Sequence, residues 1–415
     1  MPVRPRPGRP EPLPTAEMPF LSSLLAGGAA AAQSAALPPP VPALERREAL
    51  APFHAKLRAG RRVHILQLGD SHTSADAISN GLRAPLQAHF GAAGRGALAP
   101  GRPYDNYVTW QVTASQSAGW RVTSWNAPGA VPLGLSGFTQ TARGAGETLG
   151  LVADAPEHEF NRLTVCAITG PGAGAVTLRL GTVEQSWALE APRPGALCRS
   201  IESDVPVTAA AVTTLDERPV SLASIAVFRR ENRGVTVSNL GQIGAQLSNF
   251  ARGDEALVRA ELAAWRPDLI LLAFGTNEGF DPRFTLAGYD DGLRAQIARL
   301  RRLAGPDVPI VLVGPPAVTS RNAALAGAEC GDGWYVPAFL LRVRERQRAL
   351  ARALGLAFWD WERAMGGRCA ARAWHAAGLM RDDHIHFNRD GGDRIGRMLL
   401  ADLMADFEPP AGGVR

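Results

Sequence analysis

The sequence has little lysine and no long apolar run, and each shortage excludes a class of protein. Lys56 is the only lysine among 44 basic residues, and the arginines are scattered along the chain. Nucleic-acid binding favours a basic stripe interleaved with aromatic residues, and the sequence has none. The most apolar stretch, around residues 24–36, is broken by Gly, Gln and Ser. It falls short of the ~20 residues that span a bilayer, so we expect neither a nucleic-acid partner nor a membrane span.

Cysteine is also scarce, with four residues and no Cys-x-x-Cys pair, so a zinc ribbon is not supported. An even number permits two disulfides, most simply Cys166–Cys198 and Cys330–Cys369. Four small buried thiols are an equally good interpretation. The sequence leaves both open.

The first 45 residues are rich in Pro, Ala and Arg and show no periodic apolar pattern. We expect residues 1–45 to be a disordered leader and linker. An Arg-bearing start, a short apolar segment at Leu24-Leu25 and the small residues after it are typical of an export signal. Met18 is an alternative start. We therefore expect a periplasmic or otherwise exported protein.

With 46% hydrophobic residues in 415, the chain can bury one or two sizeable cores. Short apolar runs that end in Gly, Pro or polar residues predict buried parallel strands at Val63–Leu68, Val235–Asn239, Leu269–Phe274, Ile310–Val313 and Leu356–Trp359. Helical patterns lie between most of them, and Pro85 is expected to shorten the first helix. This alternation predicts an α/β domain with its parallel sheet covered on both faces.

The interval between the first two strands is too long for a crossover helix. It is rich in Thr, Val, Gly and Trp, with period-2 runs at 107–112, 121–125, 163–166 and 176–180. We therefore predict a β-sandwich-like domain at 104–230, inserted into an α/β domain formed by 46–103 and 231–410. The insert holds four of the nine tryptophans: Trp110, Trp120, Trp125 and Trp187. We expect them to be buried in the core, and the alternative is that they are exposed and stack on sugar rings.

Ser71 follows the first predicted strand, at the sheet edge where ligands bind in this fold class. Alone it would be a helix N-cap. Near the far end of the chain, Asp383 precedes His386 by three residues, so one turn can bring a carboxylate to an imidazole. Serine, histidine and aspartate together predict nucleophilic catalysis. The alternative for the second segment is a charged loop capped by Asn388 or Asp390.

Five of these polar residues can also be interpreted as a metal cluster: Asp70, His72, Asp383, His384 and His386. We do not favour it, because the serine would have no role and the ligand spacing is not diagnostic. Two other strand ends carry Gly241-Gln242-Ile243-Gly244 and Asn277. Glycine lets a substrate approach backbone N–H groups, and an Asn amide can donate to an oxyanion. The alternative for both is an ordinary turn.

Four blocks in this order resemble the SGNH (GDSL-type) hydrolases: Gly69-Asp70-Ser71-His72, Asn239 to Gly244, Gly275-Thr276-Asn277-Glu278 and Asp383-His384-Ile385-His386. His72 stands where many members have Leu, and Glu278 where Asp is usual. The resemblance covers about 64–100 and 232–407. It implies an esterase on a three-layer α/β/α flavodoxin-like fold.

Carried over residue by residue, the resemblance makes Ser71 the nucleophile, His386 the general base and Asp383 the residue that orients it. The oxyanion hole would be the Ser71 N–H, the Gly244 N–H and the Asn277 amide. No cofactor and no metal are implied. Gly241 is the rival for the glycine role. His384 is the rival base if the register of the turn differs.

The residues Gly69–Asp76, with Phe90-Gly91 and Gly94-Arg95-Gly96, more narrowly resemble Gram-negative peptidoglycan O-acetylesterases, which carry a carbohydrate-binding-module-like insert after the first block. The resemblance implies hydrolysis of an acetyl or other short acyl ester of a cell-envelope glycan. We also expect a monomer. Two alternatives remain: an O-acetyltransferase that uses the same three residues, and a noncatalytic glycan-binding envelope protein.

Overall fold

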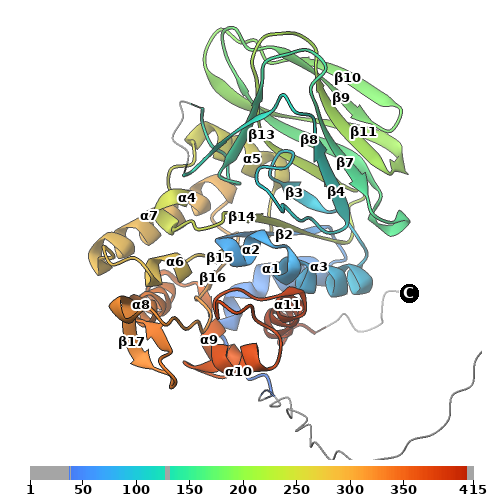
Figure 1. Ribbon diagram of the computed structural model, residues 1–415. Coiled ribbons are helices and arrows are strands. Elements are labelled where there is room, and N and C mark those ends of the chain that lie inside the picture. Colours follow the sequence, from blue (N-terminus) through green and yellow to red (C-terminus); the bar gives the residue numbers. More distant parts are fainter. Residues whose placement is uncertain (1–36, 38, 127–130, 409–415) are drawn as a thin grey trace, which may run out of the picture. The chain divides into compact units, whose positions relative to one another are not determined.

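A computed structural model describes residues 37, 39–126 and 131–408 (Figure 1). The predicted export segment lies outside these residues. The end of the predicted leader, however, belongs to the fold, because β1 (Leu44–Glu45) pairs antiparallel with β19 (Ala357–Trp359). Leu44 is buried, and its burial beside an otherwise open strand edge explains the pairing.

The main sheet has six strands in the order β1-β19-β16-β15-β2-β14. The remaining bounds are Ile310–Val313 for β16, Leu269–Ala273 for β15, Val63–Gly69 for β2 and Val235–Gly241 for β14. All pairs except β1–β19 are parallel. Numbered along the chain, the five parallel strands have the spatial order 2-1-3-4-5, which is flavodoxin-like and confirms the predicted fold class.

Helices cover both faces of this sheet. Side chains of β2 alternate between two cores: Val63 and Ile65 contribute to one, and Leu66 and Leu68 to the other. The first core includes α1 (Ala51–Arg58), α3 (Ala77–Phe90), α9 (Trp361–Met365), α10 (Ala370–Ala376) and α11 (Arg389–Leu403). The second includes α4 (Leu247–Phe250), α5 (Glu255–Trp265), α7 (Leu286–Ala304) and α8 (Ala338–Leu354). The shorter helices are η1 (Arg47–Leu50), α2 (Ser71–Ser74), η2 (Pro156–His158), α6 (Thr276–Gly279) and η3 (Ala323–Leu325).

Helix α3 corrects one expectation, because it continues through Pro85 to Phe90. A proline inside a helix costs about 3 kcal/mol, so packing must compensate for it. At Gly81 the backbone of α3 touches α11 so closely that an added Cβ would lie 2.5 Å from the Asp393 carbonyl oxygen. This contact, together with burial of Leu82 and Leu86, holds the helix together on both sides of the proline.

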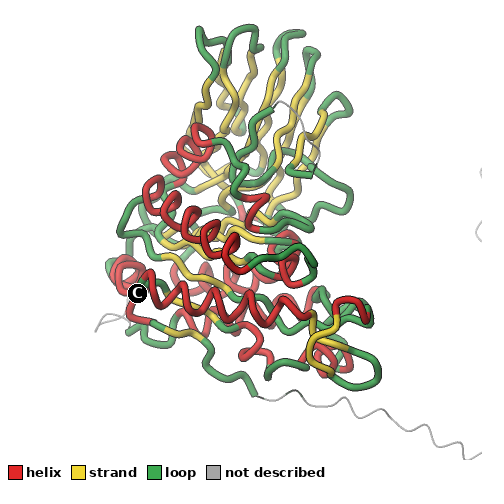
Figure 2. The backbone as a smooth tube through the Cα atoms, turned by 90° about the vertical axis from the view of Figure 1, so that its left-hand side faces the viewer, coloured by secondary structure: helices red, strands yellow, loops and turns green. Residues whose placement is uncertain are grey.

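Residues 112–228 form strands joined by loops, with η2 as the one helical turn among the described residues there (Figure 2). One sheet has the order β10-β9-β12-β7-β4 and the other β11-β8-β13-β6-β5. The first comprises β10 (Val183–Ala188), β9 (Ala175–Leu180), β12 (Ala209–Thr214), β7 (Thr148–Ala153) and β4 (Val112–Gln116). The second comprises β11 (Gly195–Val207), β8 (Phe160–Thr169), β13 (Val220–Phe228), β6 (Phe138–Ala142) and β5 (Arg121–Ser124).

A shared core of apolar residues lies between these two antiparallel sheets, as expected for an inserted β-sandwich. The short strand β3 (Gly96–Leu98) also pairs with β13, although it precedes the predicted insert. The described residues, 37, 39–126 and 131–408, all belong to one compact unit. The predicted domain boundaries therefore stay a prediction.

The strand predicted at 107–112 is wrong, because the strand there is β4 and begins only at Val112. Two buried side chains take the backbone groups of Trp110 that a strand would have paired. Asp76 Oδ2 accepts its N–H at 2.9 Å, and Arg95 Nε donates to its carbonyl at 2.9 Å. Gln111 then has a φ of 75°, outside the range of a strand.

The tryptophans of the insert divide between the two expected fates. Trp120 and Trp187 are buried in the sandwich core, whereas Trp110 and Trp125 are partly exposed. All four cysteines form the two disulfides, Cys166–Cys198 and Cys330–Cys369. No helix among the described residues is both long and apolar enough to cross a bilayer.

Candidate active site

Three strands of the parallel sheet end at the candidate site. Ser71 follows β2, Gly244 follows β14 and Asn277 follows β15. In a sheet of this topology the strand order reverses at β2, and ligands bind outside the carboxyl ends of the strands at that point. Asp70 caps α2 by accepting the His72 N–H, so Ser71 is the first residue of a helical turn. The fold thus brings together residues that are far apart in the sequence.

Ser71, His386 and Asp383 form a continuous chain of hydrogen bonds. The Ser71 Oγ lies 2.9 Å from His386 Nε2, and His386 Nδ1 lies 2.7 Å from Asp383 Oδ2. A carboxylate only accepts, so Nδ1 carries the ring proton and Nε2 is free to accept the serine hydroxyl. The imidazole is therefore oriented as a general base toward a serine nucleophile.

The Asp383 carboxylate is fixed by its own turn. Its Oδ1 accepts the N–H groups of Ile385 and His386, at 2.8 and 2.9 Å. Partial burial would raise the pKa of Asp383, but the backbone and side-chain N–H groups of His386 outweigh that effect and lower it. The carboxylate stays ionised opposite the imidazole, where it can stabilise the imidazolium that forms when the serine proton is transferred.

The two remaining residues of the expected oxyanion hole lie on neighbouring turns. Asn277 Nδ2 donates to the Ala245 carbonyl at 2.8 Å, which ties the turn after β15 to the turn after β14. An amide has two N–H bonds, so the second is not used by this contact. Gly244 has a φ of 72°, a left-handed conformation that favours glycine.

Gly241, the rival for the glycine role, has a packing function. A Cβ added there would lie 2.1 Å from the Ser74 backbone nitrogen, so only glycine lets β14 approach α2. At Gly244 the nearest atom to an added Cβ is in the Trp125 ring, at 3.7 Å. The space beside Gly244 is therefore more open than that beside Gly241.

His384, the rival base, makes its contacts away from Ser71. Its ring stacks on Trp334 with centroids 3.7 Å apart and planes 4° apart, and its Nδ1 lies 3.2 Å from Thr319 Oγ1. Burial, and then the neighbouring positive charges, lower its pKa, so the ring is neutral. Its φ of 55° makes it the left-handed residue of the turn between Asp383 and His386. His384 thus anchors that turn.

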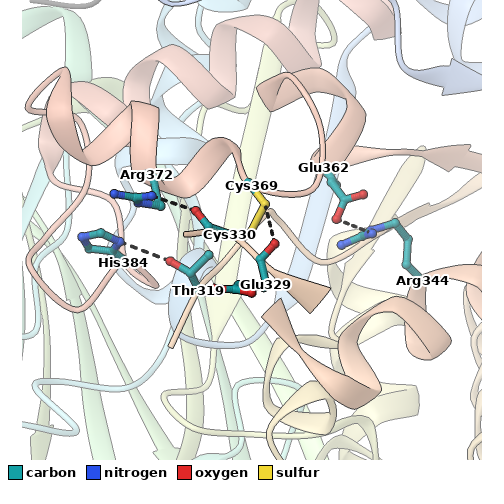
Figure 3. The surroundings of a disulfide bond; sticks show 8 residues. All are labelled: Thr319, Glu329, Cys330, Arg344, Glu362, Cys369, Arg372 and His384. Carbon is teal, nitrogen blue, oxygen red and sulfur yellow. Dashed lines mark hydrogen bonds and ion pairs between the residues drawn. A yellow bond between two sulfur atoms is a disulfide. The ribbon is translucent and has the colours of Figure 1, made fainter. Parts of the chain in front are cut away.

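A disulfide lies near the turn that contains Asp383 and His386. Cys330–Cys369 joins the hairpin of β17 (Ala326–Glu329) and β18 (Tyr335–Pro337) to the start of α10. Figure 3 shows Arg372 and His384 beside it, with Arg372 Nη1 donating to the Cys330 carbonyl at 2.7 Å. The hairpin that carries Trp334 is therefore covalently attached to the body of the domain.

His72 lies beside the candidate site and makes contacts that the sequence did not reveal. Its Nδ1 lies 3.1 Å from Asp70 Oδ1 and its Nε2 lies 2.9 Å from the Ile385 carbonyl oxygen. Both partners only accept, so both ring nitrogens must donate, which requires an imidazolium. Burial alone would lower the pKa of His72, but Asp70 and the Ile385 carbonyl together raise it. The charged ring stacks against His386, with centroids 5.4 Å apart.

The alternative interpretation of Asp70, His72, Asp383, His384 and His386 as a metal cluster can be compared with the structure. Within 39–126 and 131–408, no three His, Cys, Asp or Glu side chains are grouped so that they could hold a metal ion. The only available signal for His72 was its departure from the leucine usual at that position.

The Ser71–His386 pair opens into a pocket of about 920 Å³. Its lining includes Ser71, His386 and Arg389 at the start of α11. Trp110 and His158 of η2 also line it. Its volume lies near the upper end of the ~300–1,000 Å³ typical of pockets that bury a drug-sized ligand.

Residues 216–394 match the model of the GDSL-like Lipase/Acylhydrolase family. The match includes Asn277, Asp383 and His386 but begins after Ser71. No curated protein matches the chain. A solved structure described as a peptidoglycan O-acetylesterase in action superposes with a TM-score of 0.72 at 24% identity, covering 87% of this chain and 98% of that one.

Two carbohydrate esterases of family two, from Cellvibrio japonicus and Clostridium thermocellum, match at 13% and 11% identity. The matches cover 74% and 64% of this chain and 97% and 94% of the other chains. Their TM-scores of 0.26 and 0.28 are too low to bear on the fold. Residues 216–394 are thus similar to the GDSL-like lipases and acylhydrolases, a family of carboxylic ester hydrolases. The fold over most of the chain is similar to that of the peptidoglycan O-acetylesterase.

Proposed function

We propose that the protein removes acetyl, or another short acyl group, from an O-acylated cell-envelope glycan, with O-acetylated peptidoglycan as its substrate. The observation that carries the proposal is the hydrogen-bonded chain from Ser71 Oγ through His386 to Asp383, at the edge of a pocket of about 920 Å³. The similarity of fold to a peptidoglycan O-acetylesterase supports this choice of substrate.

In the proposed mechanism, His386 Nε2 takes the Ser71 hydroxyl proton as Oγ attacks the ester carbonyl. The Ser71 N–H, the Gly244 N–H and the Asn277 amide stabilise the tetrahedral oxyanion. The carbon–oxygen bond to the sugar then breaks, and His386 gives its proton to the leaving alkoxide. Water next gives its proton to His386, attacks the acyl-serine and releases the acid, and the proton returns to Ser71.

We also propose that the protein works outside the cytoplasm, in the periplasm. Both disulfides together use all four cysteines of the sequence. Structural disulfides persist in oxidising compartments and are rare in the cytosol. They also agree with a substrate that lies in the cell envelope.

The test measures acetate released from O-acetylated peptidoglycan by the parent protein, by Ser71→Ala and by Ser248→Ala. Ser248 is exposed and does not line the pocket, so its variant is the matched serine control. We expect release by the parent and the control and almost none by Ser71→Ala. Release by Ser71→Ala at the parent rate would refute the nucleophile. Transfer of acetyl to an added glycan, without free acetate, would identify a transferase instead.

A further inference from the structure

The pocket extends well beyond the three proposed catalytic residues. An acetyl ester needs only the space beside Ser71 and His386, whereas the cavity continues to Trp110, Asp154 and His158. Along this far wall, Asp105, Asn106 and Thr109 supply charged and polar groups. An aromatic ring among polar side chains suits a sugar, whose hydroxyls need hydrogen bonds and whose ring has an apolar face. Apolar side chains, among them Ile78, Val108 and Ile243, also line the pocket, so the choice of a sugar rests on Trp110 and the polar groups beside it.

Trp110 lies in this wall together with Tyr104, and its ring contacts Arg389, which also lines the pocket. Its partly exposed ring lies under the guanidinium of Arg389, with the Cζ 4.4 Å from the ring centroid. Arg389 is exposed and begins α11, three residues after His386. A cation–π contact at an exposed site is weak, so a sugar ring can replace the guanidinium on the indole. The five donors of Arg389 then remain beside that sugar.

A buried ionic network fixes the backbone of Trp110. Asp76 Oδ2 accepts the Trp110 N–H, and the Arg95 guanidinium holds both the Trp110 carbonyl and Asp76 Oδ2. Arg83 Nη2 donates to the other oxygen of Asp76 at 2.7 Å. The side chains of Asp76, Arg83 and Arg95 are fully buried. The network therefore fixes the backbone of residue 110 at the pocket, and it would do so with any side chain at that position.

The same wall contains unusual backbone conformations. Asn106 and Gln111, which both line the pocket, have φ values of 59° and 75°. Left-handed conformations are costly for residues other than glycine, and they cluster at binding and active sites where surrounding structure enforces them. Asn106 and Gln111 lie on either side of Trp110 in the sequence, and the buried ionic network fixes the backbone of Trp110. The surrounding structure therefore imposes the conformation of this wall.

We infer that Trp110 and Arg389 form a sugar-binding subsite for the glycan unit next to the one that carries the ester. The inference rests on the proposed function, since it takes the ester to be part of a glycan. Trp110 stacks on the sugar ring, and Arg389 donates hydrogen bonds to its hydroxyl or carboxylate oxygens. The subsite makes the enzyme select an acylated polymer over a small free ester.

The test compares kcat/KM for O-acetylated peptidoglycan with kcat/KM for p-nitrophenyl acetate. The variants are Trp110→Ala, Trp110→Phe and, as a control on the same helix as Arg389, Arg397→Ala. Arg397 pairs with Asp393 and does not line this pocket. We expect Trp110→Ala to lower the glycan-to-small-ester ratio about 30-fold, as loss of a tryptophan hot spot does. Trp110→Phe should restore much of the ratio, and Arg397→Ala should keep the parental ratio.

The inference is overturned if Trp110→Ala leaves the ratio unchanged, or if Arg397→Ala lowers it equally. Because Asp76 and Arg95 bind only the backbone of residue 110, we expect the alanine variant to fold. Binding of O-acetylated glycan fragments to Ser71→Ala with and without Trp110→Ala provides a second measurement, in which equal affinities would also overturn it. A parent that hydrolyses p-nitrophenyl acetate but no glycan ester would instead refute the proposed function, and this inference with it.

Discussion

Glu278 should make the stability of the protein depend on pH, and Glu278→Gln should remove the part of that dependence that comes from Glu278. The residue lies on α6 beside Asn277 and is buried. Its Oε1 accepts the Leu247 N–H at 2.7 Å, whereas its Oε2 has no hydrogen-bond partner in the described part of the chain. Burial and then the nearby Asp70 carboxylate raise the pKa of Glu278 to about 7, against the Leu247 hydrogen bond that lowers it.

A raised pKa means that the folded state favours the protonated acid. Below the unfolded pKa of 4.5 both states are protonated, and the contribution to stability is fully present. As pH rises to about 7, the unfolded chain ionises while the folded chain keeps its proton, so stability falls. At about 1.4 kcal/mol per pKa unit, the loss is about 3 kcal/mol. Glutamine has nearly the same shape and never ionises.

Equilibrium urea unfolding at pH 5 and pH 8.5, with the disulfides intact, measures this effect. We expect the stability of Glu278→Gln relative to the parent to be about 2–3 kcal/mol greater at pH 8.5 than at pH 5. Glu345→Gln, at an exposed position, is the control and should show no such difference. An equal effect of Glu278→Gln at both pH values would refute the argument.

Three further predictions concern the catalytic turn and the oxyanion hole. Asp383→Asn should lower kcat on glycan esters about 1,000- to 10,000-fold, because the amide no longer fixes the His386 tautomer; steady-state kinetics showing a loss below tenfold would contradict this. Asn277→Ala should lower kcat about 100-fold or more with little change in KM, and unchanged turnover would exclude Asn277 from the oxyanion hole. His384→Val should be less stable to urea than His384→Asn by about 1–2 kcal/mol, because a β-branched residue tolerates φ 55° poorly; equal midpoints would disprove it.

The parallel strands could be predicted because each is an apolar run buried on both faces. Val63–Leu68 and Ile310–Val313 read as strands from their residue types, and the structure places β2 and β16 there. The order of strands in the sheet could not be predicted without the resemblance, because it depends on which helix packs on which face. The Pro85 expectation was wrong for a related reason. Local propensity favours a break, but the contact of Gly81 with α11 is a tertiary effect.

Asp383 and His386 could be paired from the sequence because they share one turn. Ser71 stands at a strand end 315 residues from His386, so only its residue type and the resemblance joined it to them. The role of His72 depends on the Ile385 carbonyl, which lies 313 residues away along the chain, so no local pattern contains it.

The strand predicted at 107–112 was wrong because side chains from elsewhere in the chain bind the backbone of Trp110. The alternation at 107–112 is genuine, but Asp76 and Arg95 take the backbone groups of Trp110. Local rules are expected to fail where surrounding structure imposes another conformation, and such places are often functional.

The contact between Ser71 and His386 joins positions 315 residues apart. A ribosome adds His386 to the chain 315 residues after Ser71. If these two residues act as proposed, every chain that ends before residue 386 lacks its base, however well its first strands have folded. Hydrolysis can therefore begin only after His386 has been added and the fold has brought it to Ser71. An esterase assay on a series of C-terminally shortened chains would consequently report completion of the fold as a single step.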